Sequence, residues 1–279
     1  MVGREVQLTV DRGVSHPTDV ALQIRDVHVA DDRGSEVVRG VSLEVRAGEI
    51  LGVAGVAGNG QDELVEALVG LRKVTSGTIT LNGRDVTGRS PRQMNEAGVA
   101  YIPADRHRFG LVLNFPVADN LVLTSYYRAP FAHGILRDDD AIETAARESV
   151  GKYDIRTPSA TVRTSTLSGG NQQKIVVARE FDRDLELLIL DQPTRGLDVG
   201  SIEFIHRQAI AKRDANTAIL LVSAELDEVL EMSDRIGVMY AGQIVAVVDG
   251  RTADKNEVGL LMATGGAERG GASPSEARS

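Results

Sequence analysis

Residues 167–174 read LSGGNQQK, and residues 187–198 read LLILDQPTRGLD. In the first stretch, the adjacent glycines Gly169 and Gly170 allow the backbone to approach an oxygen-rich ligand closely. Ser168 supplies a hydroxyl and occupies an N-cap position, so the helix after it directs the positive end of its dipole toward whatever lies beyond Ser168. The stretch therefore predicts an anion site at a helix N-terminus.

The second stretch opens with a run of apolar residues that ends in Asp191. Such a run is typical of a strand that is buried in a parallel sheet. Ligands of open α/β sheets bind beyond the carboxyl ends of the strands. Asp191 is therefore predicted to place a carboxylate at a ligand-binding edge.

Together, LSGGNQQK and LLILDQPTRGLD resemble the signature motif of ABC-type ATPases and their Walker B strand with the D-loop that follows it. The resemblance covers roughly residues 20–250. It implies an α/β fold of the P-loop NTPase class, with a mostly parallel sheet flanked by helices. It also implies an antiparallel β subdomain on the N-terminal side and a helical subdomain, about residues 104–180, that carries the signature. The implied cofactors are ATP and Mg²⁺, with Asp191 as the metal-side carboxylate.

A glycine-rich loop, GVAGNGQDE at residues 55–63, follows a strand predicted at residues 48–54 and precedes a helix predicted at residues 64–71. Strand, glycine loop and helix in this order are the layout of a phosphate-binding loop. The predicted nucleotide-binding residues are the three glycines that the pattern requires and their neighbours, namely Gly55, Gly58, Asn59, Gly60, Gln61, Asp62 and Glu63.

Two positions of this loop depart from the pattern. Gln61 replaces the lysine that brings positive charge to the β- and γ-phosphates, and an amide can donate a hydrogen bond but cannot neutralise charge. Asp62 replaces the serine or threonine whose hydroxyl binds magnesium, so it either repels phosphate or binds magnesium differently. An alternative role for Asp62 and Glu63 is to stabilise the first turn of the helix, by ~0.3–1 kcal/mol each. The loop is predicted to bind ATP weakly and not to support hydrolysis.

Three further catalytic positions differ from the family pattern. The residue after Asp191 is normally the glutamate that orients the attacking water, and here it is Gln192, whose amide is no base at neutral pH. The switch histidine of the family is replaced by Ala224, and the glutamine that reaches magnesium is replaced by Ala104. Together with Gln61, these departures indicate a domain whose own phosphate loop is not a hydrolytic site.

The signature motif, by contrast, is complete. In the family, each ATP is held between one domain's phosphate loop and the other domain's signature, so the resemblance implies that this chain offers its signature to a partner domain's ATP. Hydrolysis would use the partner's lysine and glutamate, and the isolated chain is predicted to have little or no ATPase activity. The expected contacts lie in the signature and the D-loop, at Ser168, Gly169, Gly170, Gln172 and Asp198.

The segments GNGQDEL, DRHRFGL and LSGGNQQK together resemble the second ATPase domain of tandem importer ATPases for simple sugars or nucleosides, and GLVLNFPVADNLVL favours nucleosides. The implied partners are a second ABC ATPase domain fused N-terminally, membrane permease subunits that dock near residues 104–130, and indirectly an extracytoplasmic solute-binding protein. The implied location is the cytoplasmic face of the cell membrane, peripheral through the permease subunits. The alternative is a non-hydrolysing nucleotide-binding regulatory or scaffold domain that never meets a membrane.

Composition narrows the classes of function. The chain has 40 acidic and 31 basic residues and a net charge of −9, which argues against a broad nucleic-acid-binding face. It has no cysteine, so disulfides and thiolate metal sites are excluded. None of its five histidines has a metal-ligand spacing, and His107 and His206 are predicted at the surface. Since neither a membrane-length apolar run nor a signal-peptide core is found, we expect an intracellular protein that reaches a membrane only through a partner.

Residues 20–264 are predicted to form one ABC nucleotide-binding domain. Its N-terminal side contains antiparallel strands at residues 20–29 and 36–45, where apolar and polar side chains alternate. Residues 1–19 are polar without a clear period, and we interpret them as a linker or the tail of a preceding ATPase domain, with an ordinary flexible terminus as an equal alternative. The composition of residues 265–279 predicts disorder.

Overall fold

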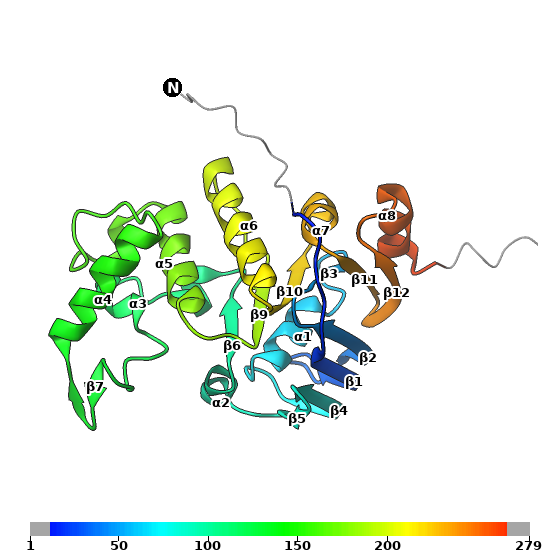
Figure 1. The fold of residues 1–279 in the computed structure, drawn as a ribbon. Helices are drawn as coiled ribbons and strands as arrows, with labels where there is room; N and C mark the ends of the chain where they lie inside the picture. The colour runs from blue at the N-terminus through cyan, green and yellow to red at the C-terminus, as the bar shows by residue number, and fades with distance from the viewer. Residues whose placement is uncertain (1–11, 267–279) are drawn as a thin grey trace, which may run out of the picture.

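The computed structural model of the chain describes residues 12–266, so the predictions for residues 1–11 and 267–279 lie outside the described part. A six-stranded sheet in the order β12-β11-β3-β10-β9-β6 forms the centre of the molecule (Figure 1). Its strands pair in parallel, except that β12 pairs antiparallel with β11. They are β3 (Ile50–Ala54), β6 (Val99–Ile102), β9 (Leu187–Asp191), β10 (Ala218–Ser223), β11 (Arg235–Tyr240) and β12 (Gln243–Asp249).

A second, antiparallel sheet has the order β2-β1-β4-β5. In β2, buried apolar side chains alternate with more exposed ones along much of the strand, which is the pattern that the sequence shows. The predicted antiparallel β subdomain and the mostly parallel central sheet are therefore both confirmed. The strands of this second sheet are β1 (Val20–Ala30), β2 (Glu36–Arg46), β4 (Val74–Leu81) and β5 (Arg84–Asp85).

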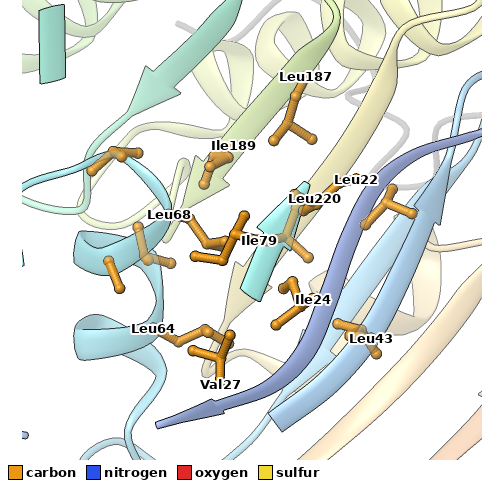
Figure 2. Close-up of a cluster of buried hydrophobic side chains, with 14 of the residues drawn as sticks. Leu22, Ile24, Val27, Leu43, Leu64, Leu68, Ile79, Leu187, Ile189 and Leu220 are labelled. Atoms are coloured by element: carbon orange, nitrogen blue, oxygen red, sulfur yellow. The ribbon is translucent and has the colours of Figure 1, made fainter. Parts of the chain in front are cut away.

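The two sheets enclose a shared apolar core together with helix α1 (Gln61–Leu68). Figure 2 shows side chains from both sheets and from α1 pointing toward one another. Full burial of each aliphatic side chain contributes roughly 1.5–3 kcal/mol, so this cluster fixes α1, and with it the end of the glycine loop, against the sheets. The labelled members are Leu22, Ile24, Val27, Leu43, Leu64, Leu68, Ile79, Leu187, Ile189 and Leu220.

The helical subdomain lies at the far side of β6 and β9 from the antiparallel sheet (Figure 1). A second apolar cluster joins it to the other face of the central sheet. The Asp138 carboxylate accepts a hydrogen bond from the Ala141 N–H at 2.9 Å, which explains where the longest helix of this subdomain begins. Its elements are α3 (Val117–Leu121), the hairpin β7 (Ala132–His133) and β8 (Leu136–Arg137), α4 (Asp139–Lys152) and α5 (Gly169–Phe181).

The other helices flank the central sheet. At the start of α2, Ser90 forms a capping box with Gln93. These helices are α2 (Pro91–Glu96), α6 (Val199–Asp214), α7 (Leu226–Met232) and α8 (Lys255–Thr264), and single helical turns lie at Arg106–Gly110 and Thr164–Thr166.

Among residues 12–266, no helix is both long enough and apolar enough to cross a membrane.

Residues 12–19 belong to the predicted linker, and their first residue is held on the core. The Arg12 guanidinium donates hydrogen bonds to the carbonyl oxygens of Leu230 at 3.1 Å and Gly250 at 3.0 Å. The buried Arg213 side chain donates in turn to the Arg12 carbonyl oxygen and lies beside Asp234. The described end of the segment is therefore part of the folded domain.

Candidate functional site

The signature motif forms the start of α5, with Ser168 at the N-cap position as predicted. Ser168 is exposed, and its hydroxyl makes no capping bond to the helix backbone. The Ser168 Oγ instead accepts a hydrogen bond from the Asn171 Nδ2 at 2.9 Å. The first turn of α5 therefore presents its backbone N–H groups without a side-chain cap, which suits an anion approaching from outside.

Packing leaves little room for a side chain at Gly170, whereas at Gly169 only the flexible end of Arg106 would have to move. A Cβ on Gly170 would lie 2.5 Å from the Ser201 Oγ and 3.0 Å from the Asp198 Oδ2. A Cβ on Gly169 would lie 2.8 Å from the Arg106 Nη2. The sequence predicts close approach to a ligand at these positions, and the structure adds close approach to the start of α6 and to the Arg106 side chain.

A cavity of about 260 Å³ opens where the starts of α5 and α6 meet the segment after α4. Two of the predicted ligand-binding residues of the signature, Ser168 and Gly170, lie in its wall beside Asp198 of the D-loop. No residue of the glycine-rich loop contributes to it. The lining residues are Asp154, Arg156, Ser168, Gly170, Asn171, Lys174, Asp198, Gly200 and Ser201.

Gln172 does not face this cavity, although the sequence predicts that it contacts a ligand. Its side chain is buried, and its Nε2 donates to the carbonyl oxygens of Leu167 at 3.1 Å and Thr164 at 3.3 Å. Its Oε1 lies 2.8 Å from the His107 Nε2. Gln172 therefore joins the helical turn at Arg106–Gly110 to the base of the signature instead of pointing outward.

Asp198 caps α6 and is already hydrogen-bonded within the chain. Its carboxylate accepts from the Ser201 N–H at 3.1 Å and from the Ser201 Oγ at 2.8 Å. The Ser201 hydroxyl, followed by backbone N–H groups, lowers the pKa of Asp198. Asp198 therefore lies close to the signature, as predicted, and its carboxylate points at the start of α6.

The glycine-rich loop is closed by its own glutamine. The Gln61 side chain is buried and folds back, so that its Nε2 donates to the Val56 carbonyl oxygen at 3.1 Å. A Cβ on Gly55 would lie 2.3 Å from this same nitrogen, which shows that Gln61 packs directly on the start of the loop. The lysine position thus supplies no charge, and its amide is turned onto the loop.

Asn59 fastens the loop to the turn between β11 and β12. Its Oδ1 accepts from the Ala241 N–H at 3.1 Å, and its carbonyl oxygen accepts from the Gly242 N–H at 3.1 Å. Gly60 approaches the Val37 carbonyl oxygen so closely that a Cβ would lie 2.6 Å from it. The sequence predicts nucleotide contacts at both positions, whereas here the Asn59 side chain and the Gly60 backbone serve the fold of the loop.

The tip of the loop and the start of α1 are accessible to solvent. Gly58 has φ +90, and a Cβ there would meet no atom within 4 Å, so the loop is open at this point. Asp62 is exposed and Glu63 is half-buried in the first turn of α1, where their charges complement the helix dipole. Both of the predicted roles for Asp62, helix stabilisation and influence on a bound cation, are compatible with this position.

Asp191 ends β9 at the carboxyl edge of the central sheet, as the sequence predicts. Its Oδ2 accepts a hydrogen bond from the Tyr101 hydroxyl at 3.2 Å, while its buried Oδ1 has no partner among residues 12–266. Burial, helped by the negative charge of Asp62, raises the pKa of Asp191 to about 6. An orphaned, buried carboxylate oxygen fits one ligand position of a magnesium ion.

The residues at the two missing catalytic positions contact each other. The Gln192 Oε1 accepts a hydrogen bond from the Ala224 N–H at 3.2 Å, and Gln192 has a positive φ of 46. The Gln192 side chain is therefore tied to the segment after β10, and Ala224 has no side-chain group that could polarise a phosphate. This arrangement offers no base to an attacking water.

Sequence reasoning missed a buried polar cluster next to Gln192. The Glu228 Oε1 accepts from the Thr194 Oγ1 at 2.8 Å and lies 3.1 Å from the His206 Nε2. The prediction that His206 lies at the surface is wrong, because the ring is only 4% exposed. The apolar spacing of α6 could have indicated burial, but nothing in the sequence pairs His206 with Glu228.

The raised pKa of Asp191 predicts how the stability of the chain depends on pH. Between pH 4 and 6 the folded chain holds a proton that the unfolded chain releases, so the free energy of unfolding falls as the pH rises. Asp191→Asn is therefore expected to stabilise the ligand-free chain at pH 8, by up to about 3 kcal/mol, with a smaller gain at pH 4. Thermal unfolding in EDTA measures the change in stability at both pH values, and Asp184→Asn at an exposed position is the control. An equal gain at both pH values would contradict the assignment.

The sequence of the chain matches a known protein family. Residues 38–195 match the family model described as ABC transporter. The chain is 50% identical over 264 residues to the guanosine import ATP-binding protein NupO of Bacillus subtilis, covering 94% of this chain and 52% of that protein. It is 49% identical over 265 residues to the nucleoside import ATP-binding protein NupA of Lactococcus lactis, covering 95% and 52%. The chain thus spans about half the length of the curated relatives it matches.

Comparison of structures gives the same fold. A nucleotide-free ATP-binding cassette from an ABC transporter superposes with a TM-score of 0.71 at 19% sequence identity, covering 88% of this chain and 96% of that chain. An ATP-binding subunit of an ABC transporter gives a TM-score of 0.72 at 19% identity, covering 88% and 100%. With the extended match to the family model, these similarities show that the chain belongs to the ABC transporter family.

Proposed function

We propose that this chain is an ATP-binding domain of an ABC importer for nucleosides, or more broadly for nucleosides and simple sugars. In this proposal it holds the ATP of a second ABC domain with its signature face, while its own glycine-rich loop binds nucleotide weakly and does not hydrolyse it. Mg²⁺ would accompany the ATP, with Asp191 as a candidate ligand on this chain's own side.

The contrast between the two anion-binding parts supports this proposal most strongly. The signature presents an uncapped helix start and an exposed Ser168 beside an open cavity. The glycine-rich loop has no lysine, and Gln61 is hydrogen-bonded to the loop itself. One part is therefore suited to holding a triphosphate from outside, and the other lacks the charge and the base that hydrolysis requires.

The relatives support the importer assignment and the partner domain. The two nucleoside relatives share 50% and 49% identity with the chain, compared with 42% for the glucose import protein TsgD13 of Haloferax volcanii. Since the chain corresponds to about half of each, we place a second ABC domain on the same polypeptide, N-terminal to this one. A solute-binding protein would act indirectly, by delivering the nucleoside to the permease.

A groove between the sheet domain and the helical subdomain is our candidate contact with the permease subunits. It has a volume of about 360 Å³, and among the residues that line it are Leu71, Met94, Phe109, Tyr126 and Tyr127. Leu71, Phe109 and Tyr126 are 45%, 38% and 52% exposed, an unusual density of large apolar side chains for a solvated surface. Docking here would place the chain on the cytoplasmic face of the membrane.

The decisive experiment compares the chain alone with the assembled transporter. We expect phosphate release from Mg-ATP by the isolated chain to equal that of a Gln192→Ala variant, because neither has a catalytic base. The protein carrying both ABC domains, reconstituted with its permease, is expected to hydrolyse ATP and to import labelled guanosine in preference to ribose. Turnover by the isolated chain above that of Gln192→Ala would contradict the proposal. Failure to recover any permease from solubilised membranes would favour a regulatory or scaffold domain.

A further inference from the structure

The signature serine is positioned by a residue that also holds a neighbouring segment. Asn171 lies in the first turn of α5, and its Nδ2 donates to the Ser168 Oγ at 2.9 Å. Its Oδ1 accepts from the Arg156 N–H at 2.8 Å, which draws the segment after α4 against the signature. One turn further along α5, the Lys174 Nζ donates to the carbonyl and carboxylate oxygens of Asp154 at 2.7 and 2.9 Å.

These bonds bring Arg156 to the wall of the 260 Å³ cavity, beside Ser168. Each of the two carboxylates in the wall is already engaged, Asp154 with Lys174 and Asp198 with Ser201. The Lys174 hydrogen bond, with a smaller contribution from the charge of Arg156, lowers the pKa of Asp154, and the Ser201 hydroxyl lowers the pKa of Asp198. Both carboxylates are therefore ionised at neutral pH, and each already has a partner within the chain.

Arg156 is the second cation of the wall, besides Lys174. Its side chain is exposed, and the ion pairs among residues 12–266 do not include it. Two helix starts, those of α5 and α6, also turn their positive ends toward this cavity. The cavity thus combines an exposed guanidinium with two helix N-termini beside Ser168, which suits a polyanion.

We propose that Arg156 is a further contact to the partner domain's nucleotide phosphates, and that Asn171 is a positioning residue that holds both Arg156 and the Ser168 hydroxyl for that contact. This inference rests on the proposed function, because it assumes that a partner's ATP reaches the signature face. It adds a charged residue 12 positions before the signature serine, on an element that the motif does not include.

The test uses the full transporter with both ABC domains, in which hydrolysis reports the competent site alone. Loss of one charge-assisted contact that both ground and transition states share raises KM and leaves kcat nearly unchanged. Arg156→Gln is expected to raise the KM for ATP about tenfold. Arg156→Lys should restore much of the affinity, since a lysine keeps the charge without the planar fork. Asn171→Ala should raise KM and also lower kcat, because Ser168 loses its partner.

The control is Arg207→Gln, which removes an exposed arginine of α6 that pairs with Glu203 and lies outside the cavity. A variant that blocks the signature itself, Gly170→Val, separates this inference from the proposed function. If Gly170→Val abolishes turnover while Arg156→Gln behaves like Arg207→Gln, the role of Arg156 is disproved and the proposed function stands. If Gly170→Val leaves turnover intact, the role of Arg156 and the proposed function are both disproved. Thermal unfolding of Asn171→Ala shows whether its effect comes from misfolding. In that case, the comparison of Arg156→Gln with Arg207→Gln decides whether Arg156 contacts the nucleotide.

Discussion

In the assembled transporter, Gly170→Val is expected to lower ATP turnover by about a hundredfold, the loss typical of removing one preorganised donor from a phosphate or oxyanion site. A Cβ at this position would lie 2.5 Å from the Ser201 Oγ and 3.0 Å from the Asp198 Oδ2. Neither atom can retreat easily, because the two are hydrogen-bonded to each other at 2.8 Å at the start of α6. The added side chain must therefore push the first turn of α5 away from α6 and out of line with the partner's ATP.

The matched control is Gly151→Val, the same substitution in α4, where an added Cβ meets nothing within 4 Å. We expect wild-type turnover from it. Steady-state phosphate release gives the comparison, and the apparent affinity of the complex for ATP should also fall in Gly170→Val. Turnover by Gly170→Val within a few-fold of Gly151→Val would mean that the signature face does not act on a nucleotide.

The fold could be predicted from the sequence because its signals are local. Apolar runs such as the one ending in Asp191 specify buried parallel strands, and alternation in β2 specifies a strand with one face covered. Caps at Ser90 and Asp138 mark where helices begin. These patterns depend on neighbours within a few residues, and the resemblance to a known family supplied the division into a mostly parallel sheet, an antiparallel β subdomain and a helical subdomain.

The site was predictable only in part, because side-chain partners come from distant segments. The motif contains three consecutive amides, and the sequence gives no reason to treat them differently. In the structure Asn171 bonds to Ser168 and Arg156, Gln172 is buried against His107, and Gln173 donates to the Pro193 carbonyl oxygen at 3.2 Å. Their roles follow from the direction in which each position of α5 faces, which depends on how the helix packs.

The fate of Gln61 illustrates the same limit. The sequence shows that the lysine is missing, but not that the replacing amide turns inward and closes the loop on the Val56 carbonyl oxygen. The inward turn depends on Gly55, whose missing side chain leaves room for the amide, and on the anchoring of Asn59 to the β11–β12 turn. Loss of charge was therefore readable from the sequence, whereas closure of the loop required the structure.

The turn after β9 is held by a buried carboxylate, and Glu228→Ala is expected to cost about 2–5 kcal/mol of stability, because each of two buried groups that loses its hydrogen-bond acceptor costs about 1–3 kcal/mol. In the variant, the Thr194 hydroxyl and the His206 Nε2 stay buried but lose the Glu228 Oε1, which lies 2.8 Å from the first and 3.1 Å from the second. Urea unfolding of the isolated domain measures the loss. Glu228→Gln, which keeps an acceptor for Thr194, should lose less.

The control for this cluster is Glu225→Ala, which removes an exposed glutamate at the start of the same helix and should change stability by no more than about 0.5 kcal/mol. A loss in Glu228→Ala as small as that would show that the pair does not hold the turn. Loss of the Glu228 contact should affect more than stability, because Thr194 lies between Gln192 and the D-loop residue Asp198. Glu228 of α7 binds this turn, and so does the N–H of Ala224 in the segment before α7. Loosening the turn should therefore also disturb the start of α6, where Asp198 meets the signature. We therefore expect Glu228→Ala to lower turnover in the assembled transporter even at temperatures where the domain stays folded, which a purely structural role would not produce.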